Sequence, residues 1–84
     1  MTLRELLNLK VVKDNVLLLV CDEEYMNKHH DYSEKYNVLR IMGRAVLEED
    51  LVKAGVREEL FNYKVRAMWG SDCKFKMGIV IEKI

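Results

Sequence analysis

Six consecutive apolar residues, Val16-Leu17-Leu18-Leu19-Val20-Cys21, decide the fold of this 84-residue chain. Successive residues of a β-strand point to opposite faces of its sheet. Because both parities are apolar here, this stretch predicts a central strand that is covered on both faces. The rest of the chain must therefore supply neighbouring strands and a layer of helices.

One short helix is expected before the central strand, and a second is expected after the strand that follows it in the chain. A capping box at Thr2 and Glu5 predicts a helix whose three leucines face the core. A second helix is expected to begin at Glu48 and to end at Gly55 in a Schellman motif. Residues 57–61 either form a separate helical turn or continue this helix.

Alternating apolar and polar residues predict three further strands, at residues 36–47, 63–69 and 74–82, of which the last two form a hairpin. The polar residues 22–35 predict a long loop, with or without a helical turn. The element order is then αββαββ. The sequence therefore predicts one α+β domain over residues 1–84, with a four-stranded, mainly antiparallel sheet and helices on one face.

Composition and charge exclude several classes of protein. Lys and Arg number 14, as do Asp and Glu, so the formal net charge is zero. No bulk field therefore draws the molecule to nucleic acid or to a membrane. No apolar run is long enough to span a bilayer, and the N-terminus lacks the pattern of a secretory signal. We expect a cytoplasmic protein with two reduced cysteines and no membrane partner.

A dense group of reactive residues follows the central strand. Cys21, His29 and His30, with the distant Cys73, could form a zinc shell. The usual ligand spacings are absent, so we predict no metal and no other cofactor; a small zinc-binding protein is the weakest alternative. No catalytic pattern is present either, and the chain is predicted not to be an enzyme. Recognition is expected instead from Tyr25, His29, His30 and Tyr32.

Six cations take the solvent-facing parity of the predicted strands: Arg40, Arg44, Lys64, Arg66, Lys74 and Lys76. If these strands are neighbours, the cations share one face, opposed there only by Glu82. Such a face would bind an acidic protein or a nucleic-acid backbone. The alternative is the ordinary polar face of an antiparallel sheet, because Lys and Arg are by default exposed.

An open face of the central strand would create an apolar stripe. The exposed residues would be either Val16, Leu18 and Val20 or Leu17, Leu19 and Cys21, together with Met42 and Met68. Exposed stripes of this kind mark interfaces, so we predict a homodimer through this face, with Leu17, Leu19, Met42 and Met68 in its interface. The alternative is that the loop of residues 25–36 folds over the stripe.

Three segments carry a family resemblance: T-L-R-E-L-L (2–7), N-V-L-L-L-V-C-D (15–22) and E-E-L-F-N-Y-K-V-R-A-M-W with F-K-M-G-I-V-I-E-K-I (58–69 and 75–84). They resemble a loose group of small proteins encoded by phages, prophages and mobile elements of Gram-positive bacteria. This resemblance implies an accessory protein of a mobile element, and some such proteins inhibit host defences by binding them. The central segment departs from the group at His29 and His30, so no residue roles carry over. We expect a non-enzymatic protein that binds another protein, such as a host-defence component; the alternative is a nucleic-acid-associated accessory protein that uses the six cations.

Overall fold

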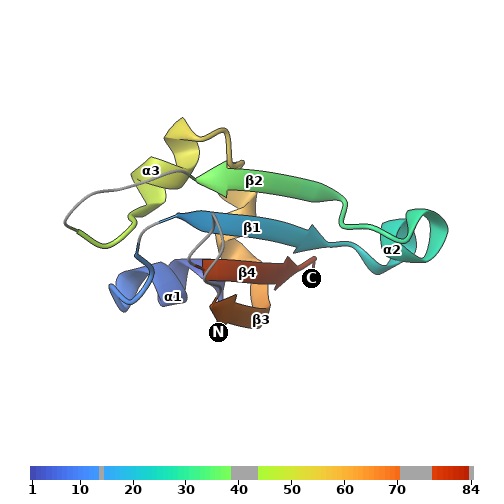
Figure 1. The fold of residues 1–84 in the computed structure, drawn as a ribbon, viewed down its shortest axis with the longest axis horizontal. Coiled ribbons are helices and arrows are strands. Elements are labelled where there is room, and N and C mark those ends of the chain that lie inside the picture. Colours follow the sequence, from blue (N-terminus) through green and yellow to red (C-terminus); the bar gives the residue numbers. More distant parts are fainter. Residues whose placement is uncertain (14, 39–43, 71–76, 84) are drawn as a thin grey trace.

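The computed structural model describes residues 1–13, 15–38, 44–70 and 77–83 (Figure 1). Its elements are α1 (Leu3–Asn8), β1 (Val16–Cys21), α2 (Glu23–His29), β2 (Glu34–Val38), α3 (Glu48–Lys53), the 3₁₀ helix η1 (Glu58–Asn62), β3 (Lys64–Gly70) and β4 (Met77–Glu82). This arrangement confirms the predicted α+β class, with α2 as an additional helix. Five residues named above lie outside the described residues: Arg40, Met42, Cys73, Lys74 and Lys76.

The strands of the described residues form one four-stranded sheet in the order β2-β1-β4-β3. β1 pairs antiparallel with β2 and parallel with β4, and β3 pairs antiparallel with β4. The sheet is therefore mixed but mainly antiparallel, as predicted. β1 is a central strand, and all its residues are buried except Leu17, which is half-buried.

The helices α1, α3 and η1 pack on one face of the sheet. That face carries Val16, Leu18 and Val20 of β1, which lie in one cluster with the apolar residues of these helices. Figure 1 shows α1 and α3 toward one end of the strands and α2 beyond the other end. In the described part of the chain, no helix has the length and hydrophobicity needed to cross a membrane.

The predicted start of α1 is confirmed in detail. The Thr2 hydroxyl accepts a hydrogen bond from the Glu5 backbone N–H, and the Glu5 carboxylate accepts one from the Thr2 backbone N–H, both at 3.2 Å. This bond from the Thr2 backbone N–H lowers the pKa of Glu5. Because α1 has only six residues, it depends on packing for its stability, and its three leucines are all buried.

The predicted end of α3 is confirmed as well. The Val56 N–H donates to the Leu51 carbonyl oxygen, and the Gly55 N–H donates to the Val52 carbonyl oxygen, each at 3.0 Å. These are the two bonds of a Schellman motif. Gly55 has a φ of 95°, a left-handed conformation that glycine adopts without steric cost. η1 is then a separate helical turn.

α2 occupies much of the segment for which a long loop was predicted. The Asp22 carboxylate caps it by accepting hydrogen bonds from the backbone N–H groups of Glu24 (3.1 Å) and Tyr25 (3.4 Å). Acidic residues in its first turn and Lys28 and His29 in its last turn complement the helix dipole. None of its residues is buried, so it has no apolar periodicity from which it could be predicted.

The prediction for residues 36–47 is wrong at both ends that the structure describes. β2 begins at Glu34, and Val38 is buried opposite Val16 on the helix-covered face. Val38 has the same parity as Arg40 and Arg44, so the alternation predicts it on the solvent side. Beyond residue 43 the described chain is no longer in the sheet: Ala45 makes an isolated bridge with Lys13. The alternation predicted over residues 36–47 therefore combines part of β2 with residues that lie outside the sheet.

A β-bulge also changes the side-chain alternation predicted for β3. The register shifts between Val65 and Ala67, so that Val65 pairs with Ile81 while Ala67 pairs with Val80. Because a bulge inserts one extra residue, all later side chains change faces. Ala67 and Trp69 therefore lie on the opposite face of the sheet from Val65.

Candidate functional site

The sheet face opposite α1, α3 and η1 is called here the outer face. Directly paired residues of neighbouring strands point to the same face, so the register defines its members. They are Lys35 and Asn37 of β2, Leu17, Leu19 and Cys21 of β1, Gly78, Val80 and Glu82 of β4, and Lys64, Ala67 and Trp69 of β3. Arg66, the extra residue of the bulge, also reaches this face, because its guanidinium contacts the Cys21 thiol.

The centre of the outer face is a small apolar cluster. Leu19, Cys21 and Val80 are buried, with Leu17, Met26 and Tyr32 packed against them. Within the described residues, α2 is the helix that reaches this cluster, and it does so through Met26 alone. Among the described residues, the predicted alternative of a loop folded over the strand is thus realised only at the Cys21 end, and no layer of helices covers this face.

Trp69 lies at the other side of the outer face. It pairs with Gly78 across the β3–β4 ladder. A Cβ atom on Gly78 would overlap the indole ring, so the ring lies directly against the glycine backbone. Trp69 nevertheless keeps 41% of its surface exposed, and its neighbour Ala67 is exposed too. The sequence offered a faint signal, because a strand glycine often marks a close approach of another group.

Three cations among the described residues lie on the outer face: Lys35 of β2, opposite Leu19, and Lys64 and Arg66 of β3. Arg66 holds its Nη1 atom 2.7 Å from the Cys21 Sγ atom, and Cys21 Sγ lies 3.3 Å from Met26 Sδ. Lys64 is exposed and pairs across the ladder with Glu82. The outer face is therefore positively charged along β3, and the Glu82 carboxylate partly offsets this charge.

The predicted six-cation face is not assembled by the described residues. Arg44 lies outside the sheet and binds Asp50 through two hydrogen bonds, at 2.7 and 2.8 Å. This pairing, opposed by the burial of the carboxylate, holds the pKa of Asp50 at about 2, with a further bond from the Leu47 N–H. Of the predicted cations, only Lys64 and Arg66 are described on the outer face. Nucleic-acid binding through all six stays a prediction.

The predicted recognition residues of the 22–35 segment do not converge. Tyr25 and His29 stack on the surface of α2, with ring centroids 4.3 Å apart. His30 ends the helix in a left-handed conformation and is exposed. Tyr32 instead packs on the outer-face cluster, so only this one of the four belongs to the same surface as Trp69.

The described residues among those considered for zinc, Cys21, His29 and His30, form no common site. Cys21 is buried beside Arg66 and Met26, whereas His29 and His30 are exposed on and after α2. Among the residues that the structure describes, no group of three or more His, Cys, Asp or Glu residues could hold a metal ion.

The three predicted dimer residues that the structure describes lie on different faces of the sheet. Leu17 and Leu19 belong to the outer face. Met68 pairs with Ile79, whose side chain is in the helix-covered core, so Met68 points to that side of the sheet. It is 49% exposed because it lies on an edge strand. These three residues therefore do not form one stripe.

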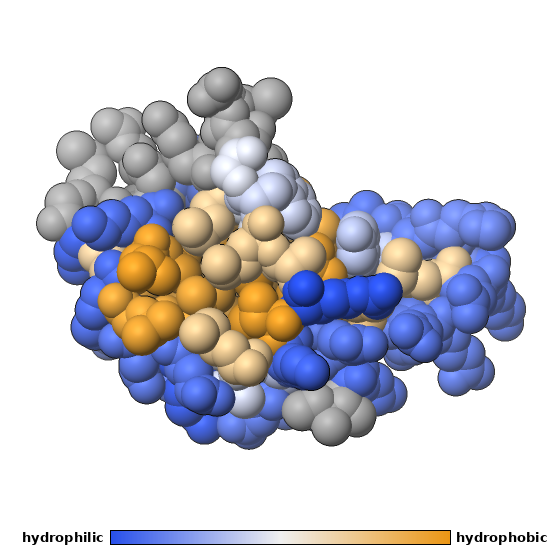
Figure 2. All heavy atoms as spheres, turned by 90° about the horizontal axis from the view of Figure 1, so that it is seen from below, coloured by the Kyte–Doolittle hydropathy of each residue, from blue (hydrophilic) through white to orange (hydrophobic). Residues whose placement is uncertain are grey.

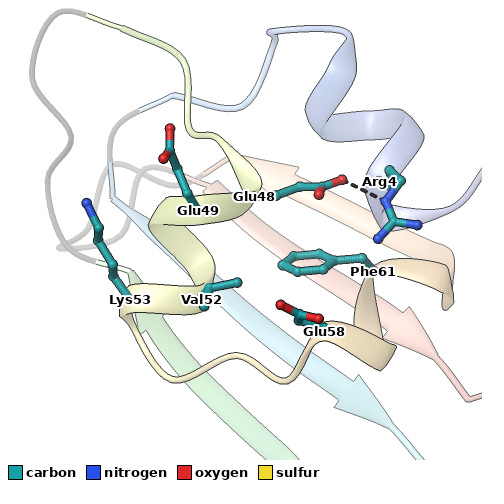
Figure 3. Close-up of a pocket in the computed structure, with 7 residues that line it drawn as sticks. All are labelled: Arg4, Glu48, Glu49, Val52, Lys53, Glu58 and Phe61. Atoms are coloured by element: carbon teal, nitrogen blue, oxygen red, sulfur yellow. Dashed lines mark hydrogen bonds and ion pairs between the residues drawn. The ribbon is translucent and has the colours of Figure 1, made fainter.

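A separate hollow of about 520 Å³ lies between α3 and η1, where Figure 3 shows Phe61 with Arg4 on one side and Val52 on the other. Arg4 binds Glu48 at 2.8 Å and holds its guanidinium carbon 5.9 Å from the centre of the Phe61 ring. In the described part of the chain, no buried side-chain polar atom lacks a hydrogen-bond partner. The hollow is lined mainly by charged side chains: Arg4, Glu48, Glu49, Lys53 and Glu58, together with Val52 and Phe61.

Another polar cluster joins β2 to η1. Arg57 pairs with Glu34 and Glu59, and the Tyr36 hydroxyl donates to Glu34. Burial raises the pKa of Glu34, but the bonds from Tyr36 and Arg57 outweigh it and leave the pKa below its usual value. Each of these side chains has a hydrogen-bond or ion-pair partner within the cluster, which indicates that the cluster serves to connect β2 to η1.

Comparison with protein-family models, with curated proteins and with solved structures found no match for this chain. The functional argument therefore rests on the geometry of the outer face.

Proposed function

We propose that this protein is a non-enzymatic interaction module that binds another protein through its outer face. The observation that supports the proposal is Trp69, which lies against Gly78 and is 41% exposed beside an apolar cluster. A tryptophan whose orientation is already restricted loses little freedom on binding and buries a large apolar area. Residues of this kind dominate the binding energy of protein interfaces.

The surroundings of Trp69 favour a particular partner chemistry. Ala67 and the half-buried Leu17 extend the apolar region, and Lys64 and Arg66 lie along its border. This pattern is complementary to a protein surface with an apolar centre and acidic groups at its rim. The resemblance to small proteins of mobile elements supports a bacterial protein, such as a component of host defence, as the partner.

The proposal is tested by comparing two aromatic truncations. The wild-type protein, Trp69→Ala and Tyr25→Ala are immobilised and exposed to a lysate of a Gram-positive bacterium, and the bound proteins are identified by mass spectrometry. Tyr25 is the matched control, because it is 39% exposed but lies on α2. We expect Trp69→Ala to reduce specific capture by at least about tenfold, since hot-spot truncations cost more than ~1.4 kcal/mol. Tyr25→Ala should capture as the wild type does.

Equal capture by the wild type and Trp69→Ala, or greater loss with Tyr25→Ala, would refute the outer face as the binding surface. A captured protein can then be purified and titrated directly. Trp69 is the only tryptophan in the chain, so a change in its fluorescence reports contact at this face.

A further inference from the structure

The outer edge of β3 is only partly occupied. β3 is an edge strand of the described sheet, and its start is paired with the N-terminal residues. The Leu3 N–H donates to the Tyr63 carbonyl oxygen at 2.9 Å, and the Val65 N–H donates to the Met1 carbonyl oxygen at 2.8 Å. Within the described residues, no backbone hydrogen bond is recorded along this edge after Val65.

The hydrogen bonds of β4 show which β3 groups face this edge. The Met77 N–H donates to Asn15 and the Lys83 N–H donates to Cys21, both to carbonyl oxygens at 3.1 Å. The odd-numbered residues of β4 therefore direct their backbone groups toward β1. Since these directions alternate along a strand, the even-numbered residues direct theirs toward β3.

The partners of those even-numbered residues are Ala67 and Trp69, whose backbone groups are thus used within the sheet. The intervening Met68, and Gly70 after it, direct their N–H and C=O groups away from the sheet. Val65 follows the same rule, because its outward N–H is the one bound by Met1. The part of the edge that no described residue occupies, called here the free part, is therefore centred on Met68.

This free part lacks the features that usually protect an edge strand. Ala67, Met68, Trp69 and Gly70 include no charge and no proline, and Met68 and Trp69 are 49% and 41% exposed. Proteins normally blunt such edges with lysine, proline or a covering segment. Figure 2 shows hydrophobic surface gathered in the middle of the side on which β3 is the edge strand, with hydrophilic surface around it.

We propose that β3 pairs antiparallel with β3 of a second copy, about a two-fold axis at Met68. An unpaired strand edge offers backbone donors and acceptors that another strand satisfies. In this register Met68 lies opposite Met68 of the second copy and Ala67 lies opposite Trp69, and the regular pairing ends at the bulge residue Arg66. No like charges are opposed, and the pairing ends where Met1–Leu3 begin to cover the edge.

The second copy is favoured over a foreign strand because the free stretch is complementary to itself. A two-fold interface matches each residue with one from the same segment, and about Met68 this brings together only the uncharged residues Ala67, Met68 and Trp69 of the two copies. The resulting dimer would contain one continuous eight-stranded sheet. It goes beyond the proposed function, and it would place the two outer faces side by side with both Trp69 rings near the axis.

Met68→Pro is the sharpest test. Proline removes an N–H that points outward, so the β3–β4 ladder keeps its hydrogen bonds while pairing with a second copy is blocked. We expect light scattering of the purified wild-type chain to give twice the 9.9 kDa mass, and that of Met68→Pro to give the single mass. Circular dichroism checks that the variant is folded.

Met68→Lys tests the same edge without a change of backbone. It should also lose the dimer, because lysine at an edge opposes strand addition. Val52→Lys is the matched control: Val52 is 43% exposed on α3, and this variant should remain dimeric. In the wild type, the Met68 amide should exchange with solvent more slowly as the protein concentration rises.

The proposal is overturned by a wild type that stays monomeric at millimolar concentration, or by a dimer that survives both substitutions at Met68. A monomer whose Met68 amide becomes protected only by a foreign peptide also overturns it, since the occupant would then be another chain. These measurements use the pure protein, so their failure is distinct from failure of capture by the outer face.

Discussion

At the scale of single residues, the pair of Trp69 and Gly78 links sequence to function. The glycine lacks a side chain at the one point where the indole ring meets the strand, so the ring can lie against the sheet and still present a face to solvent. Contact between an aromatic residue and a strand glycine also compensates for the weak packing of glycine in a sheet.

Gly78→Ala should displace the indole ring. We expect the tryptophan emission to move to longer wavelength and the free energy of unfolding to fall by about 1–3 kcal/mol, as for overpacked positions. Fluorescence and urea denaturation measure both. Gly55→Ala is the control, because its new Cβ would meet no atom within 4 Å but its φ of 95° would be strained. It should lower stability without moving the emission; an unchanged spectrum in Gly78→Ala would contradict the contact.

Asp50 makes the stability dependent on pH. Its carboxylate is paired with Arg44, which holds its pKa at about 2 instead of the usual 3.8. Because the pKa is lower in the folded state, the stabilisation is complete above about pH 4 and is lost as the pH falls toward 2. Asp50→Asn should therefore cost about 2 kcal/mol at pH 7 and much less at pH 2.

Urea denaturation of the wild type and Asp50→Asn at several pH values measures this difference. Asp31→Asn is the control, because Asp31 forms an exposed ion pair with Lys35, and such pairs contribute little. A difference between the wild type and Asp50→Asn that does not change between pH 7 and pH 2 would show that the Arg44 pair is not its source.

At the scale of elements, β1 separates the two faces of the sheet. Leu18 is fully buried in the main core, whereas the adjacent Leu17 is half-buried on the outer face. Leu18→Ala should therefore cost about 2–5 kcal/mol, and Leu17→Ala clearly less, because a residue near solvent leaves a smaller cavity. Urea denaturation of both variants makes the comparison, and similar costs would mean that the outer face is packed as tightly as the core.

The helix ends with strong local signals were predictable, and the elements without such signals were not. Thr2 with Glu5, and Gly55 with Val56, carry their capping interactions within a few residues, so the sequence alone reveals them. α2 is capped as well, but it buries no residue and so has no apolar period. The bulge at residues 65–67 depends on pairing with β4, which no local pattern encodes.

At the scale of the whole molecule, one main core joins all the layers. Its residues come from α1, β1, β2, α3, η1 and β4, so the chain should unfold in a single step. We expect far-UV circular dichroism and Trp69 fluorescence to give the same urea midpoint. If β3 joins two copies, this midpoint should rise with protein concentration, because association stabilises the folded state.

Separate midpoints for the two signals would indicate that β3 and its tryptophan unfold apart from the core. A midpoint that is independent of concentration in the wild type, and equal to that of Met68→Pro, would argue against the dimer.

The candidate site could be predicted only in part. The alternation correctly predicted that Met77 and Ile79 of β4 face the core and that Lys64 faces the opposite side, which is the outer face. A strict period of two takes no account of the residue inserted at the bulge, so it predicts Trp69 on the same face as Val65, whereas the two lie on opposite faces. It also placed Arg44 in the sheet, where the structure has an ion pair with Asp50 instead.

The sequence by itself determined the class of the fold. The apolar run of β1 predicted its central position in the sheet, and local capping residues predicted the start of α1 and the end of α3. Only the tertiary structure decided which face has no helical layer, which side chains share it, and where an edge lies open. Those properties depend on strand order and register, which arise from contacts between residues far apart in the chain. The position of Trp69 over Gly78 is one such contact, and it is the one on which the proposed function rests.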